Sequence, residues 1–358
     1  MYKVGKSVIA GLMAGGLFLA GSLAAAAAGS GNMVNGTAAG AADIVQETAV
    51  FMRDEAEDMA KAAAAEAEAK AAAEEEAAAA AAAAEAEPEE IRLDESWEFA
   101  DYSKIHDGAA VLYKAPANRK NITIGVNAGH GTQGGNSVKT YCHPDQSAKT
   151  TGGSTSAGSI EATAVSSGMT MHDGTPEHAA TLDVARTLRD LLLENGYDVL
   201  MVRDGEDVQL DNIARTVICN NTADCHIAIH FDGDGLSYDK GAFYISVPDG
   251  IKNMYPVSDN WQACDELGEN LTEGLASAGV DIYGNGSMQI DLTQTSYSTI
   301  PSVDIELGNA ATNLTDERIE QYAEGLLKGI EEYPFEESLP EQGAEDMQQG
   351  SEQSSEQD

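Results

Sequence analysis

Positive charge is scarce in this chain of 358 residues. Lys and Arg together number 20 against 60 Asp and Glu, which gives a formal net charge of −40. Proteins that bind nucleic acid neutralise its phosphates with clustered Lys and Arg side chains. We therefore expect no nucleic-acid partner. The acidic residues gather in two segments, because residues 53–98 hold 16 acidic and 4 basic residues and residues 331–358 hold 10 acidic residues and no basic residue.

Two metal-binding patterns that depend on close spacing are also missing. The four cysteines form no C-x-x-C pair, which argues against a structural zinc knuckle; they are Cys142, Cys219, Cys225 and Cys264. Four cysteines allow three disulfide pairings, and the sequence leaves both disulfides and free buried thiols open. No H-E-x-x-H segment occurs, so no helix carries two zinc-binding histidines one turn apart.

The N-terminus has the pattern of an export signal. Lys3 and Lys6 precede an apolar run from Val8 to about Ala28, which ends in small residues that suit cleavage. No cysteine follows for lipid attachment. The run is also long enough for an uncleaved anchor, which would tether the protein to the membrane. In both cases we expect the rest of the chain to lie outside the cytoplasm.

The segment that follows has no large apolar residues to hold a coiled coil together. Residues 54–90 are almost entirely Ala, Glu and Lys, which favour a helix strongly. We expect a semi-rigid helical spacer that ends near Pro88, and a helix that binds a protein partner is the alternative. The domain prediction is a signal or anchor over 1–28, a spacer and linker over 29–118, a folded domain over 119–333, and an acidic disordered tail over 334–358.

Residues 119–333 alternate strand and helix patterns. Strands are expected at 122–126, 197–202, 225–230, 241–247 and 302–307, and helices from 176 to a stop at Asn195-Gly196, and at 207–221, 261–275 and 314–331. Thr175 fits the N-cap of the first helix, with Pro176 at its first helical position and Glu177 in its first turn. The alternation predicts an α/β fold of three layers, in which helices flank a mostly parallel mixed sheet.

Four residues stand where such a fold places ligands, beyond the carboxyl ends of strands or at a helix start. They are His130, Glu177, His230 and Glu306. Two His and one Glu can hold a catalytic zinc ion and leave its fourth position to water, while a second Glu moves protons. Each His, and Glu177, taken alone also fits a purely structural role. Glu306 in V-D-I-E-L fits one less well, because a buried carboxylate needs a partner. We assign structural roles to the other histidines: His106, His143, His172, His178 and His226.

Taken in order, these segments resemble the zinc-dependent N-acetylmuramoyl-L-alanine amidases called amidase type 3, a family of secreted peptidoglycan hydrolases. The resemblance covers about 120–333 and is carried by A-G-H-G at 128–131, T-P-E at 175–177, N-G-Y-D-V at 195–199 with Arg203, N-I-A-R at 212–215, I-A-I-H at 227–230 and P-S-V-D-I-E-L-G at 301–308. It implies one Zn²⁺ per chain, held by His130, Glu177 and His230. It implies that Glu306 is the catalytic base and then acid.

The chain departs from the family pattern at several positions. The family commonly has Asp where this chain has Asn127, and Asn where it has Asp232. After the catalytic glutamate the family often has G-F and an Asn six residues on, whereas this chain has Gly308-Asn309 and places Asn313 seven residues on. The insert at 131–176 is long, and its G-G-S-T-S-A-G-S run predicts a mobile loop at the mouth of the site, either a lid or tolerated extra length.

The resulting hypothesis is a secreted, cell-wall-associated autolysin that cuts the amide between N-acetylmuramic acid and L-alanine of peptidoglycan. Two alternatives remain: a zinc peptidase or deacylase that acts on another amide, and a non-catalytic wall-binding or scaffold protein on a decayed amidase fold. We find no separate wall-binding repeat in the sequence. Oligomeric state and stem-peptide preference stay open.

Overall fold

The computed structural model describes residues 59, 61–65, 67, 69–70 and 87–335. The chain divides into two compact units, Met1–Ala73 and Glu74–Asp358. The described residues of the first unit are helical and exposed, as expected for an Ala/Glu spacer. The predicted signal segment at 1–28 and most of the predicted tail, residues 336–358, lie outside the described residues. Within the described part, no helix is both long enough and apolar enough to cross a membrane.

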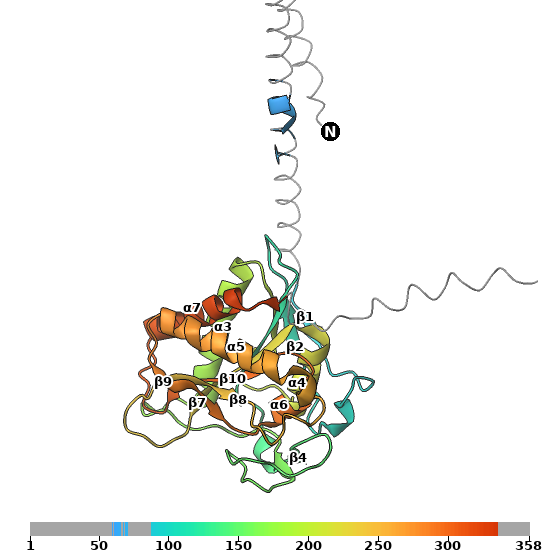
Figure 1. Cartoon of the computed structure of the whole chain (residues 1–358), viewed down its shortest axis with the longest axis vertical. Helices are drawn as coiled ribbons and strands as arrows, with labels where there is room; N and C mark the ends of the chain where they lie inside the picture. The colour runs from blue at the N-terminus through green and yellow to red at the C-terminus, as the bar shows by residue number, and fades with distance from the viewer. Residues whose placement is uncertain (1–58, 60, 66, 68, 71–86, 336–358) are drawn as a thin grey trace, which may run out of the picture. The chain divides into compact units, whose positions relative to one another are not determined.

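A mixed sheet of eight strands forms the centre of the second unit, within residues 87–335 (Figure 1). Its strands in spatial order are β1 (Glu89–Ile91), β2 (Ala110–Tyr113), β6 (Asp198–Met201), β3 (Thr123–Ala128), β7 (Cys225–Asp232), β10 (Ser302–Asn309), β8 (Ala242–Ser246) and β9 (Ile282–Gln289). The four strands β6, β3, β7 and β10 run parallel to one another, whereas β2 and β8 run antiparallel to their inner neighbours. The carboxyl ends of the central strands therefore meet at one edge.

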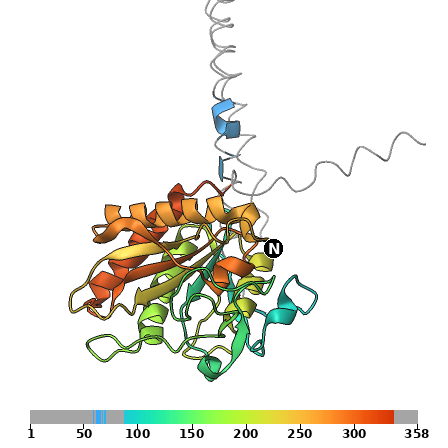
Figure 2. The ribbon, with the colours of Figure 1, turned by 60° about the horizontal axis from the view of Figure 1, so that its bottom comes forward.

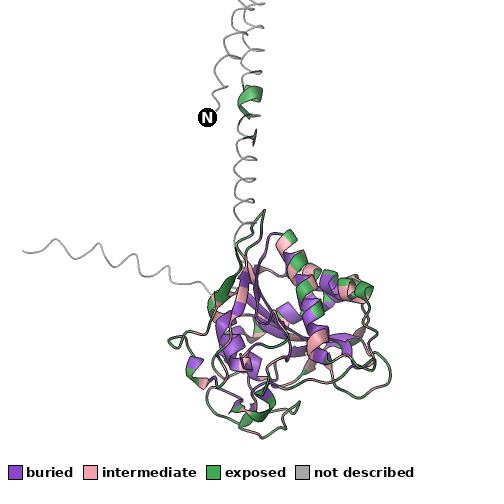
Figure 3. Cartoon of the chain, turned by 180° about the vertical axis from the view of Figure 1, so that it is seen from behind, coloured by how far each residue is buried: buried purple, intermediate pink, exposed green. Residues whose placement is uncertain are grey.

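Helices cover both faces of this sheet, which confirms the predicted three-layer α/β fold (Figure 2). The first face carries α3 (Glu177–Glu194), α5 (Val257–Ser277) and α7 (Asp316–Glu332). Their apolar side chains join those of the strands in the main core, where Leu188, Leu271 and Leu326 are fully buried. The second face carries α4 (Asn212–Thr222), which contacts β3, β7 and the short α6 (Thr293–Tyr297) and buries Ala214 and Ile218 in a second core cluster. Buried residues accordingly concentrate on the strands and on the inner sides of the helices (Figure 3).

The structure differs from the sequence prediction in several details. The helix predicted over 207–221 begins only at Asn212, where Asp211 caps it, and strand β9 was not predicted. Strands β1 and β2 come from residues that we expected to form a linker. They join the central sheet through the pairing of β2 with β6, a distant contact that their own sequence does not indicate. The prediction of Thr175 as N-cap is wrong, since α3 begins at Glu177 with extended Pro176 before it and no side chain capping it. All four cysteines are free and buried, so of the two states left open the structure shows free thiols.

The insert between β3 and α3 carries its own small sheet. Strands β4 (Lys139–Tyr141) and β5 (Glu161–Thr163) pair antiparallel as a two-stranded sheet, preceded by a short 3₁₀ helix at Gly135–Ser137. The Gly- and Ser-rich run at 152–159 connects the two strands. This insert therefore has a defined shape in the structure rather than forming one long featureless loop.

Candidate active site

His130 lies in a tight turn directly after β3. Its backbone has a φ of 64°, and that of Gly131 is 69°, so two successive residues adopt the left-handed conformation. A side chain on Gly129 would place its Cβ 2.3 Å from the ring of His230, and one on Gly131 would meet Arg203 at 2.6 Å. The two glycines therefore let the chain turn where a larger residue would collide with the site.

Two buried arginines hold the carbonyl groups of this turn. Arg203 donates to the main-chain oxygens of Ala128 at 3.1 Å and Gly129 at 3.0 Å. Arg215 donates to the main-chain oxygen of His130 at 2.6 Å and to that of Ala128 at 3.3 Å. Both arginine side chains are almost completely buried. They fix the backbone that carries His130, because a turn with positive φ has few hydrogen bonds of its own.

Asn127, one of the residues that depart from the family pattern, is part of the same support. Its amide oxygen accepts from Arg215 at 3.0 Å, and its amide nitrogen lies 3.1 Å from Nε2 of His226. Burial, with the charge of Arg215 in second place, lowers the pKa of His226 to about 3, so this imidazole is neutral. An amide can donate to the neutral ring and accept from the guanidinium, whereas a carboxylate can only accept.

The ligand-bearing atoms of His130, Glu177 and His230 converge at one point. Nε2 of His130 lies 2.8 Å from Oε1 of Glu177 and 3.1 Å from Nδ1 of His230, and that Nδ1 lies 3.3 Å from the same Oε1. Among the described residues this is the group of side chains that could hold a metal ion. Three elements bring them together: the turn after β3, the first residue of α3 and the part of β7 near its carboxyl end.

Glu177 is the most fully bonded carboxylate of the site. Its Oε2 accepts from the main-chain N–H of Met169 at 2.9 Å, and its Oε1 accepts from that of Phe231 at 3.1 Å. Burial alone would raise the pKa of Glu177, but its close contacts with His130 and His230 lower it well below its usual range. Its position at a helix N-terminus also favours the charged form. Glu177 is therefore an ionised carboxylate held in one orientation.

The proton arrangement of the two histidines favours a cation between them. Nδ1 of His130 lies 2.8 Å from the main-chain oxygen of Ser166, which can only accept, so Nδ1 carries the proton and Nε2 presents a lone pair. Burial lowers the pKa of His130, partly offset by Glu177, and keeps this ring neutral. Burial also opposes charge on His230, but Asp304 and Glu177 raise its pKa to about 10. The site thus stabilises positive charge, and its N, N and O donors fit a zinc ion.

Glu306 and Asp304 lie on the same face of β10 as alternate residues, beside His230. Glu306 pairs with His230 across the parallel strands, and Oδ2 of Asp304 lies 3.8 Å from Nε2 of His230. Oε2 of Glu306 and Oδ1 of Asp304 are buried without a hydrogen-bond partner. Burial raises the pKa of both carboxyl groups, and for Glu306 the neighbouring Asp304 raises it further. Buried acceptors without a partner are rare and mark a place for a water, a proton or a ligand.

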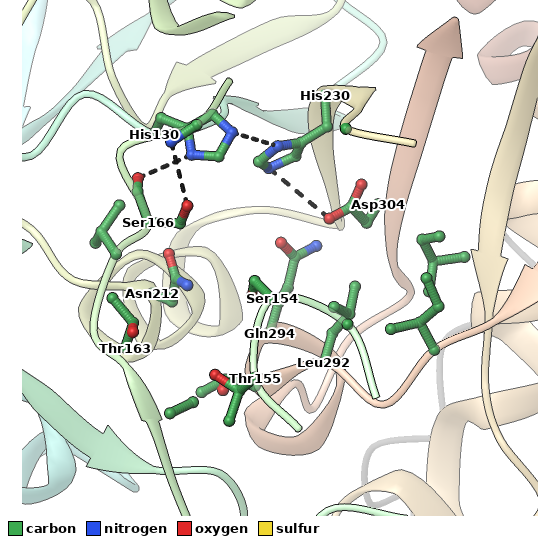
Figure 4. Close-up of a pocket in the computed structure, with 18 of the residues that line it drawn as sticks. His130, Ser154, Thr155, Thr163, Ser166, Asn212, His230, Leu292, Gln294 and Asp304 are labelled. Atoms are coloured by element: carbon green, nitrogen blue, oxygen red, sulfur yellow. Dashed lines mark hydrogen bonds and ion pairs between the residues drawn. The ribbon is translucent and has the colours of Figure 1, made fainter. Parts of the chain in front are cut away.

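These residues open into one pocket of about 520 Å³ (Figure 4). His130 and His230 lie on one side of it, and Ser154 and Thr155 of the insert lie across from them, with Gln294 between. The pocket thus has two walls, one built by the ends of β3, β7 and β10 with the start of α3, and one built by the insert. We call these the sheet wall and the insert wall.

The structure brings together all four residues singled out in the sequence and adds several that were missed. Asp304 could have been found, since side chains alternate along a strand and residues 304 and 306 share a face. The supporting role of Ser166 had no sequence signal, because it depends on a tertiary contact. Arg215 ends the N-I-A-R segment singled out at 212–215, but that segment did not reveal its role. The histidines assigned structural roles stay apart from the convergence point, and His143, for example, is fully buried against Asp291.

Comparisons with known proteins agree with this geometry. A family model described as N-acetylmuramoyl-L-alanine amidase matches residues 124–332. The apo form of the N-acetylmuramyl-L-alanine amidase Ami1 from Mycobacterium abscessus is 20% identical, with a TM-score of 0.50 over 60% of this chain and 98% of that chain. The corresponding Ami1 from Mycobacterium smegmatis is 18% identical, with a TM-score of 0.51 over 61% and 98%. No curated protein matches. Because the family model covers more than half of the sequence, the chain belongs to the N-acetylmuramoyl-L-alanine amidase family of peptidoglycan hydrolases.

Proposed function

We propose that this protein is a zinc-dependent amidase that hydrolyses the bond between the lactyl group of N-acetylmuramic acid and L-alanine of the stem peptide. The observation that carries the proposal is the convergence of His130, Glu177 and His230 within 3.3 Å beside Glu306 in a pocket. The family match supports the reaction class. The unpartnered buried oxygen of Glu306 supports a proton-transfer role for that residue.

In this proposal His130, Glu177 and His230 would hold one Zn²⁺ through their converging atoms. When bound, zinc supplies Lewis acidity and lowers the pKa of a water to about 7. The chain supplies the orientation of the ligands: Ser166 holds the ring of His130, and main-chain N–H groups hold the carboxylate of Glu177. Such outer contacts fix ligand geometry and raise metal affinity.

Glu306 moves the protons. It takes a proton from the attacking water and passes it to the amine nitrogen of L-alanine as the amide bond breaks. Burial and the nearby Asp304 raise the pKa of Glu306, which makes it a better base than a solvated carboxylate and lets it keep the proton until the amine leaves.

The substrate places the enzyme at the cell wall. We propose that residues 1–28 direct export and that the protein acts outside the cytoplasm, with peptidoglycan as its main partner. Sequencing the N-terminus of the protein recovered from culture medium and from membranes distinguishes a cleaved signal from a retained anchor.

The test combines metal content with product identity. Purified protein is expected to carry one zinc per chain by elemental analysis and to release stem peptides with a free L-alanine amine from purified cell walls, as identified by mass spectrometry. EDTA should abolish release and added zinc should restore it. Stoichiometric zinc with wall binding but no cleavage would contradict the proposal in favour of a binding protein. Cleavage of a different amide would contradict it in favour of a peptidase or deacylase.

A further inference from the structure

The insert wall is anchored by a buried polar cluster around Asp291, which precedes α6. One oxygen of Asp291 lies 2.9 Å from Nε2 of His143, and the other accepts from the main-chain N–H of Thr150 at 2.7 Å and from its hydroxyl at 3.0 Å. The hydroxyl of Thr151 accepts from the main-chain N–H of Asp291 at 2.7 Å. His143, Thr150 and Thr151 all belong to the insert. This segment is therefore attached to the domain at a fixed place, and the mobile loop that the sequence suggested is tethered on one side of its tip.

Lys149 belongs to this anchored segment and lines the pocket. Its charged side chain is buried with few hydrogen-bond or ion-pair partners. The residue is only 6% exposed. Its ammonium group donates to the main-chain oxygen of Asp291, and across residues 87–335 it makes no ion pair with a carboxylate. Burial lowers the pKa of Lys149, and the charge of Asp291 only partly offsets this. An ammonium group has three N–H donors, so Lys149 has donors to spare for an anion that enters the pocket.

Among the charged side chains that line the pocket, Lys149 is the one with free N–H donors for an anion. Arg215 also lines the pocket, but its five N–H donors are all engaged: by the oxygens of Leu210, Asn127, Ala128, His130 and Thr132. Positive charge on the sheet wall is already compensated, because the carboxyl groups of Asp304, Glu177 and Glu306 surround His230. A carboxylate of the substrate that lies beyond the reacting amide is therefore accommodated best on the insert wall, where Ser154 and Thr155 add neutral hydroxyl groups.

We propose that Lys149 binds a carboxylate of the stem peptide and makes the insert wall the specificity element of this enzyme. The inference rests on the proposed amidase function. It assigns the reaction to the sheet wall and the choice among stem peptides to the insert. A carboxylate of the second or of the third stem residue would supply the same chemistry, and matched substrates distinguish the two.

The experiment compares paired substrates that differ in one charge. The first pair is N-acetylmuramoyl-L-alanyl-D-glutamate and its D-isoglutamine counterpart. The second pair carries a third residue with a free or an amidated terminal carboxyl group. The full chain is expected to cleave the charged member of one pair with a kcat/KM about 10- to 100-fold higher, the effect of one hydrogen bond to a charged group. Lys149→Met should abolish that preference by raising KM for the charged member with kcat unchanged, and Lys149→Arg should restore part of it.

Lys120→Met is the matched control, because it removes the same charge from an exposed site outside the pocket. It should keep the preference of the unchanged protein. Equal cleavage of both members of both pairs by the unchanged protein overturns the proposal, whether or not Lys149→Met folds. A preference that persists in a folded Lys149→Met also overturns it. Failure to cleave any of the four substrates instead overturns the amidase function on which the proposal rests.

Discussion

The two walls of the pocket are built in different ways. The sheet wall consists of imidazoles and carboxylates on the ends of central strands and on the first residue of α3, each placed by the main core. The polar side chains of the insert wall are hydroxyl groups and one ammonium group, on a segment that lies outside the main sheet. We propose hydrolysis for the groups of the sheet wall and substrate binding for those of the insert wall.

The carboxylates in the pocket and behind the insert wall differ in how fully they are hydrogen-bonded. Glu177 and Asp291 have hydrogen bonds to both oxygens, so each holds a structure in place. Glu306 has a buried oxygen with no partner, at an energetic cost that a purely structural residue would not carry. Full bonding thus accompanies support, and incomplete bonding accompanies the group proposed to react.

The largest effect is expected at Glu306. Glu306→Gln keeps the size of the side chain but removes its ability to take a proton, so kcat should fall by about 10²- to 10⁴-fold. Zinc content should stay at one per chain, because Glu306 is not among the converging ligand atoms. Stem-peptide release and elemental analysis on the same preparation provide the measurement. Full activity in this variant would refute the proposed mechanism.

Glu177→Ala separates support from reaction on the same wall. It should lower zinc affinity by more than the roughly 10- to 100-fold that is typical for the loss of an outer contact, because a ligand itself is removed. It also leaves the N–H groups of Met169 and Phe231 without their acceptor, at about 1–3 kcal/mol each. Competition with a chelator measures affinity, and urea unfolding measures stability. Undiminished zinc affinity would show that Glu177 is no ligand.

The sheet wall was predictable and the insert wall was not, for a physical reason. Each buried strand can be recognised from its own short sequence, and His130, His230 and Glu306 follow such strands or lie within them. The α/β topology then brings the ends of these strands together. Lys149 and Asp291 are 142 residues apart, and no periodicity relates them. Strands β1 and β2 were missed for the same reason, since β2 pairs with β6 across a long stretch of chain. Asn127 looked anomalous until its contacts with Arg215 and His226 showed what an amide does there.

Asp304 is expected to have a smaller effect on the sheet wall. Its carboxylate lies 3.8 Å from the nitrogen of His230 that faces away from the convergence point. Asp304→Asn should lower zinc affinity by about 10-fold, within the range for outer contacts, because the charge that favours a correctly oriented His230 is lost. Zinc competition assays check this, with kcat measured at saturating zinc. An unchanged affinity would place Asp304 outside the metal's support.

The smallest effect on the reaction is expected at Asp291, which supports only the insert wall. Asp291→Asn should destabilise the domain by about 1–3 kcal/mol, because a buried charged acceptor for His143 and Thr150 is lost. Zinc content and kcat should not change, whereas KM should rise as the insert loosens. Asp249→Asn, at an exposed carboxylate, should shift stability by less than about 0.5 kcal/mol.

The stability effect of Asp291→Asn should depend on pH in a direction that the pKa of Asp291 determines. Burial raises the pKa of Asp291, but the hydrogen bonds with His143 and Thr150 lower it by more than burial raises it. The resulting pKa therefore lies below the usual Asp value of about 3.9. A carboxylate with a depressed folded pKa stabilises the fold above its unfolded pKa and loses that contribution as the pH falls through the folded pKa. The difference in unfolding free energy between the unchanged protein and Asp291→Asn should therefore be constant from about pH 5 to 7 and shrink below about pH 4. A stability difference that instead increases as the pH falls would mean that Asp291 is bound as a neutral acid.

The kinetics of Asp291→Asn test the division between the two walls. If kcat fell as KM rose, the insert wall would take part in the reaction itself, and the division would be wrong.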